Sequence, residues 1–85
     1  MALQVDVVSA EERLWQGEAT RVIARTVEGD IGILTGHAPT LAILAAGQVQ
    51  ILTGSGETVA ATVQDGFLSV EHDRVTIVSQ DATLG

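Results

Sequence analysis

The sequence has 85 residues, enough for one small domain and too few for two separate cores, so residues 1–85 are predicted to form a single domain. Hydrophobic residues make up 46% of the chain and charged residues 18%, a balance that argues against a disordered protein. The formal net charge of −7, from 11 acidic residues against four arginines, repels phosphate groups and disfavours nucleic acid and anionic lipid as partners.

The sequence also constrains where the protein resides. It has no cysteine, which excludes a disulfide framework and a zinc ribbon. No window approaches the roughly 18 apolar residues of a membrane span, and the start MALQVDVV lacks the basic region of a signal peptide. We therefore expect a cytosol-facing protein without direct lipid insertion.

Apolar and polar residues alternate through most of the chain, which is typical of half-buried strands. A first strand begins at Leu3. A second, Arg13–Glu18, contains the single tryptophan and Gly17, which we expect to mark a bend or bulge. Thr20–Val27 is predicted as a third strand.

The stretch Glu28–Leu44, EGDIGILTGHAPTLAIL, breaks this pattern. Gly29 and Gly32 are predicted to hold Asp30 at the tip of a tight turn, and Gly36 and Pro39 to bracket His37 in a second rigid corner. The segment Ala38–Ala46 is ambiguous between strand and helix. The stretch is open to three interpretations, a catalytic loop, a docking loop or a plain connector, and we favour docking because loops on a rigid scaffold commonly carry recognition.

Alternating segments return in the second half of the chain, and turn signals around residues 54–56, 64–66 and 71–74 separate them. The predicted strands are Gly47–Thr53, Thr58–Val63, Phe67–Val70 and a last one through Val75 and Ile77. The tail Gln80–Gly85 has too little pattern to assign. Many short strands with almost no helix predict an all-β fold, either an antiparallel sandwich or a barrel.

The sequence contains few residues that could act in catalysis or bind a metal or cofactor. Only His37 and His72 could act as a base, and neither lies in a recognisable catalytic motif. A metal site made from both histidines with Asp30 and Asp65 has no supporting ligand spacing, and no glycine-rich phosphate loop is present. We predict no catalytic residue, no cofactor and no bound metal.

The segments VDVVSAEERLWQGEA, EGDIGILTGHAPTLAIL and VQDGFLSVEHDRVTIVSQDA together resemble the N-terminal domain of the epsilon subunit of F-type, proton-transporting ATP synthases. The similarity covers residues 3 to about 82, and GHAP after GDIGI is its most specific part. The resemblance implies a flattened sandwich of two five-stranded, mostly antiparallel sheets, with about ten short strands.

The resemblance also implies a function and partners. In this family the sandwich is a non-catalytic part of the central stalk, which docks the gamma subunit onto the c-ring and turns with both, coupling proton translocation to ATP synthesis in the alpha and beta subunits. Carried over by position, the c-ring-facing turn falls on Glu28, Gly29 and Asp30. The gamma-facing surface falls on Ser9, His37 and Ala42. The expected location is the cytoplasmic face of a bacterial plasma membrane, or alternatively the stromal side of a plastid thylakoid.

Two features depart from the family pattern. Family members commonly continue into a C-terminal helical hairpin, whereas this sequence stops at Gly85, so regulation by such a hairpin is not expected from these residues. Thr35 stands where the family often has proline. A different class of function also stays open, a free-standing acidic sandwich that binds a small ligand or carbohydrate, although the scarcity of aromatic residues argues against it.

Overall fold

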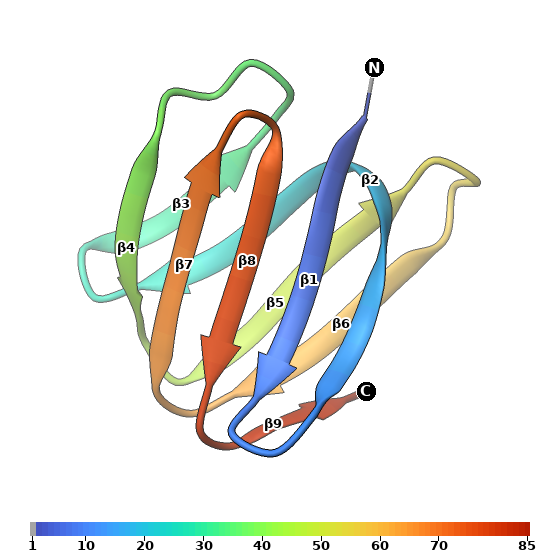
Figure 1. The fold of residues 1–85 in the computed structure, drawn as a ribbon. Coiled ribbons are helices and arrows are strands. Elements are labelled where there is room, and N and C mark those ends of the chain that lie inside the picture. The colour runs from blue at the N-terminus through green and yellow to red at the C-terminus, as the bar shows by residue number, and fades with distance from the viewer. Residues whose placement is uncertain (1) are drawn as a thin grey trace.

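The computed structural model describes residues 2–85, and these residues form an all-β sandwich (Figure 1). It has nine strands: β1 (Leu3–Ser9), β2 (Arg13–Thr26), β3 (Gly29–Ile33), β4 (Thr40–Leu44), β5 (Gly47–Thr53), β6 (Thr58–Val63), β7 (Gly66–Glu71), β8 (Arg74–Ser79) and β9 (Ala82–Leu84). Within residues 2–85 there is no helix of the length and hydropathy needed to cross a membrane. The all-β sandwich predicted from the sequence is confirmed.

The long strand β2 joins the two layers of the sandwich. Its first half, Arg13–Ala19, pairs with β1, and its second half pairs with β3 and β5. One layer contains β4, β7, β8, β1 and the first half of β2; the other contains β3, the second half of β2, β5, β6 and β9. The strands therefore form one continuous hydrogen-bonded network, in which each layer has five segments when β2 is divided between them.

Strand pairing is antiparallel throughout the described residues except between β1 and β8, which are parallel. The expectation of mostly antiparallel sheets therefore holds. The sequence pattern placed two strands where β2 runs unbroken from Arg13 to Thr26. Strands β3, β4 and β9 lie in segments that the pattern left as loop, ambiguous or unassigned.

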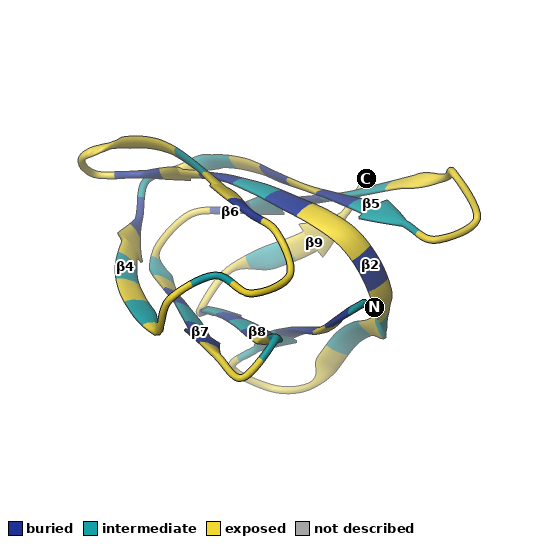
Figure 2. Ribbon diagram, turned by 90° about the horizontal axis from the view of Figure 1, so that it is seen from above, coloured by how far each residue is buried: buried dark blue, intermediate teal, exposed yellow. Residues whose placement is uncertain are grey.

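The two layers enclose a core built from alternate residues of the strands, as the burial colours of Figure 2 show. The core contains only aliphatic side chains and alanine, which fits the strict alternation seen in the sequence. Its members are Leu3, Val5, Val7, Ala19, Val22, Ala24, Ile33, Leu44, Val49, Ile51, Ala61, Val63, Leu68, Val70, Val75 and Ile77. Packing of these side chains holds the two layers together, and with them the loops at their ends.

Gly17 has a different role from the one predicted. It pairs regularly with Val5, and the register shifts of β2 lie elsewhere. A Cβ atom at this position would lie 2.8 Å from the indole ring of Trp15, which packs against the core. The glycine therefore leaves room for the neighbouring tryptophan ring, which a side chain here would displace, and it does not mark a bend in the strand.

Candidate docking site

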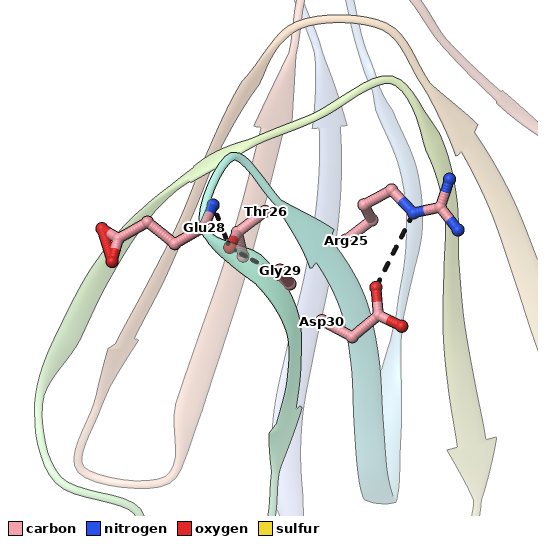
Figure 3. Close-up of polar contacts among 5 residues, drawn as sticks. All are labelled: Arg25, Thr26, Glu28, Gly29 and Asp30. Carbon is pink, nitrogen blue, oxygen red and sulfur yellow. Dashed lines mark hydrogen bonds and ion pairs between the residues drawn. The ribbon is translucent and has the colours of Figure 1, made fainter.

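The turn between β2 and β3 is held by the side chain of Thr26. Its hydroxyl donates to the carbonyl oxygen of Gly29 at 2.6 Å and accepts from the N–H of Glu28 at 3.1 Å (Figure 3). Thr26 and Gly29 are paired, so Val27 and Glu28 form the tip. Gly29 has a φ of 125°, which side-chain-bearing residues rarely adopt. The turn is consequently tight and its shape is fixed.

The prediction that Asp30 lies at the tip is wrong. Asp30 is the second residue of β3 and is paired with Arg25 of β2. The Nε of Arg25 lies 3.7 Å from Oδ1 of Asp30, and both side chains are well exposed, at 63% and 70%. Cross-strand pairing explains the difference, because it draws Gly29 and Asp30 into the ladder and leaves the tip to the two preceding residues.

The two acidic side chains of this turn point in different directions. Figure 3 shows the Asp30 carboxylate turned toward Arg25 and the Glu28 carboxylate on the other side of the hairpin. Among residues 2–85 no ion pair involves Glu28, whereas the charge of Asp30 is partly balanced by Arg25. Glu28 is therefore the carboxylate with more freedom to meet a cationic or N–H group of a partner.

A hollow separates this turn from β4. The N–H of Val27 donates to the carbonyl oxygen of Ile43 at 3.0 Å, which closes the sandwich at one end of β4. Beyond that bond the strands diverge and leave a hollow of about 350 Å³. It is lined by Thr26, Val27, Glu28, Gly29, Asp30, Ile31, Thr40, Leu41, Ala42 and Ile43. The structure thus brings the three predicted c-ring-facing residues next to Ala42.

Exposed apolar side chains gather beside the hollow. Val27, Leu41 and Ile43 are 65%, 70% and 56% exposed, and Phe67 of β7, paired with Ile43, is 39% exposed. We call these four residues the β4 patch. Clustered exposed apolar residues bordered by charged ones are typical of protein interaction surfaces.

Sequence reasoning named none of these four residues as part of a site. Leu41 and Ile43 lie in the run TLAIL, which has apolar residues on both faces of the strand and therefore no alternation. A short strand that is apolar on both faces and belongs to a half-exposed layer must expose some of its apolar residues. The run TLAIL was therefore the available sequence signal for an exposed apolar surface, but its segment was left ambiguous between strand and helix.

Ser9 is engaged by its own turn. Its hydroxyl accepts from the N–H groups of Glu11 and Glu12, at 3.3 and 3.2 Å, and donates to the carbonyl oxygen of Glu12 at 3.1 Å. These bonds shape the connection between β1 and β2. A partner at this position would therefore meet a hydroxyl that is already hydrogen-bonded.

His37 is half-buried in the loop between β3 and β4. Its Nδ1 lies 2.8 Å from the carbonyl oxygen of Ala38, and because a carbonyl only accepts, this contact requires the proton on Nδ1. The hydroxyl of Thr40 donates to the same carbonyl at 2.9 Å.

The three predicted gamma-facing residues do not form one cluster. Ser9 pairs with Ser79 at one end of β8, whereas the loop that carries His37 bonds to Asp73, next to the other end. The six residues of β8 span roughly 20 Å. Ala42 lies on β4, at the hollow. A partner that contacts all three residues must extend along the length of the sandwich.

The metal site that was weighed from the sequence has no geometric basis. Asp65 precedes β7 and His72 follows it, so these two residues lie at opposite ends of that strand. Within the described part of the chain, no three histidine, aspartate or glutamate side chains gather where they could hold an ion.

Comparison with known proteins gives a consistent assignment. The profile of the family described as ATP synthase, Delta/Epsilon chain, beta-sandwich domain matches residues 2–85. An ATP synthase epsilon chain from Micrococcus luteus is 52% identical over 83 residues, which are 98% of this chain and 91% of the relative. The epsilon chain of Streptomyces avermitilis is 45% identical over 82 residues, which are 96% of this chain but 66% of that relative.

Among solved structures, a chain of the Euglena gracilis mitochondrial ATP synthase, in an assembly described as OSCP/F1/c-ring, matches with a TM-score of 0.91 and 26% identity. The match covers 98% of this chain and 53% of the Euglena chain. The present sequence therefore spans about half the length of that structural relative. On the strength of the profile match and the high identity to epsilon chains, this chain belongs to the ATP synthase delta/epsilon chain family and represents its beta-sandwich domain.

Proposed function

We propose that this chain is a non-catalytic subunit of the central stalk, which docks the gamma subunit onto the c-ring and so couples proton translocation to rotary ATP synthesis. The observation that carries the proposal is the β4 patch and its hollow, bordered by Glu28 and Asp30, on a domain of this family. The c-ring named in the description of the Euglena assembly supports the choice of partner. Residues 1–85 act as one rigid domain in this scheme.

The two kinds of contact have different physical roles. Apolar burial of the β4 patch against gamma supplies most of the affinity, at about 25 cal/mol per Å² before the costs of association. The acidic turn, with Glu28 at its tip, meets cationic or N–H groups of a c-subunit loop. Such rim charges set the register and the rate of association more than the affinity.

The proposed gamma-facing residues Ser9, His37 and Ala42 extend the contact beyond the hollow. Because they are spread along the sandwich, gamma lies against its length in this proposal. The assembly is peripheral, on the cytoplasmic face of a bacterial plasma membrane, in keeping with the bacterial origin of the similar epsilon chains.

A sugar-binding module is less well supported. Stacking of a sugar ring requires an exposed aromatic face, and Trp15 packs over Gly17 and against the core. Phe67 is the other aromatic side chain and belongs to the β4 patch.

Reconstitution tests the proposal. The chain is added to a bacterial ATP synthase depleted of its epsilon subunit, and binding to gamma and proton-driven ATP synthesis are measured. We expect binding and at least partial recovery of coupled synthesis, while the purified chain alone shows no turnover. Failure both to bind gamma and to restore coupling would refute the proposal.

A further inference from the structure

The turn between β7 and β8 has an unusual backbone. Glu71 pairs with Arg74, so His72 and Asp73 are the two residues of a tight hairpin turn, with φ values of 51° and 58°. They are the only residues other than glycine with positive φ in the described part of the chain. Turns of this type favour Asn-Gly, because side chains strain a left-handed backbone. Aspartate and histidine tolerate this region better than most residues, so the φ value alone assigns neither a role; a side-chain contact that glycine could not make is the further observation needed.

The side chain of Asp73 contacts a distant segment. Its Oδ1 accepts a hydrogen bond from the N–H of Gly36 at 2.7 Å, and its carbonyl oxygen accepts from the N–H of Gln4 at 2.8 Å. Figure 1 shows this turn at the same end of the sandwich as the loop between β3 and β4. Asp73 therefore connects β1, the hairpin turn and that loop.

The β3–β4 loop, residues 34–39, has few other constraints. It takes part in no strand pairing. Within it, the N–H of His37 donates to the carbonyl oxygen of Leu34 at 3.2 Å, and Gly36 has a φ of 80°. The short bond from Gly36 to a carboxylate is charge-assisted and stronger than a neutral bond of this kind. Gly36 directly precedes His37 in the chain, so this bond also controls the position of His37.

We propose that Asp73 is a positioning residue, which fixes the β3–β4 loop through the N–H of Gly36 and thereby presents His37 to a protein partner. Glycine would relieve the strain at position 73 but would lose the acceptor. The structural half of the inference, fixation of the loop, stands alone. The half that concerns His37 and the partner rests on the proposed docking of gamma.

Three variants in the β7–β8 turn separate the effect of the Asp73 carboxylate from the effect of backbone strain. Asp73→Gly removes both the strain and the carboxylate, Asp73→Asn retains an acceptor oxygen, and His72→Gly is the matched control that removes strain from the exposed neighbouring residue. Asn and Gly are favoured in this turn, so all three variants should fold. Folding is checked by the thermal unfolding midpoint, which should not fall in any of them.

Amide exchange at Gly36, measured by NMR, reports the state of the loop. We expect exchange about fivefold faster or more in Asp73→Gly, as loss of a hydrogen bond of ordinary net strength implies. Asp73→Asn retains an acceptor but loses the charge assistance, so its exchange should lie between those of the original protein and Asp73→Gly, and His72→Gly should be unchanged. Unchanged exchange in Asp73→Gly would overturn the inference.

Affinity for the gamma subunit tests the second half. We expect Asp73→Gly to bind several-fold more weakly, and Asp73→Asn and His72→Gly to bind as the original protein does. A loosened loop with unchanged affinity would overturn the role of Asp73 in docking. If the original protein fails to bind gamma, the proposed function fails, whereas the exchange rates still decide whether Asp73 holds the loop.

Discussion

Replacing Leu41 by alanine gives the most direct measure of the β4 patch. The substitution removes the equivalent of three CH₂ groups, worth about 2.4 kcal/mol on complete transfer from water, at about 0.8 kcal/mol per group. Leu41 is 70% exposed in the free protein. If the contact with gamma buries that exposed part, the loss is about 1.7 kcal/mol, or about 17-fold in Kd.

Titration calorimetry with purified gamma subunit measures this change. The free energy of unfolding should shift by less than about 0.5 kcal/mol, because an exposed side chain contributes little to the core. Leu84→Ala is the matched control, since Leu84 is an exposed leucine, 47% accessible, on β9. Wild-type affinity for Leu41→Ala, or an equal loss for Leu84→Ala, would show that the β4 patch is not the surface that gamma covers.

The other predictions concern the core, a glycine and the acidic turn. Leu68→Ala, at a fully buried position, should lower the free energy of unfolding by about 2 to 4 kcal/mol in urea titrations. Gly66→Ala should destabilise the fold by about 3 kcal/mol or more, because its Cβ would clash with the carbonyl oxygen of Val78, whereas Gly32→Ala, which meets open space, should not. Asp30→Arg should weaken binding to isolated c-ring while shifting stability by less than about 1 kcal/mol, since its ion pair with Arg25 is exposed. A sharp fall in its unfolding midpoint would instead mark Asp30 as structural.

Much of the fold could be predicted from the sequence. The alternation that predicted a strand at Thr20–Val27 matches the burial there, since Val22 and Ala24 are buried and Arg21 and Arg25 are exposed. The hairpins at 54–56 and 71–74 lie where the turn residues indicated, and so does the turn at 64–66, which connects β6 of one layer to β7 of the other. These features are local, because a strand's two faces and a turn's backbone angles depend on residues a few positions apart.

The site was harder to predict than the fold. The sequence pattern did not indicate β3, which contains glycines, or β4, which is an unbroken apolar run. These two strands form because β3 pairs with β2 and β4 pairs with β7. Pairing with β2 also moved Asp30 from the predicted tip into the ladder. Ser9 and His37 could be named from the resemblance, but their separation along the sandwich depends on the register of β8.

The all-β class, the alternating core and the family can be read from short-range order along the chain. Three other features depend on long-range contacts: β2 crosses both layers, the β4 patch borders the acidic turn, and Asp73 contacts Gly36, 37 positions away. These contacts depend on which strands pair and in which register. The choice of partner strands and the register are both set only when the two layers close over one core.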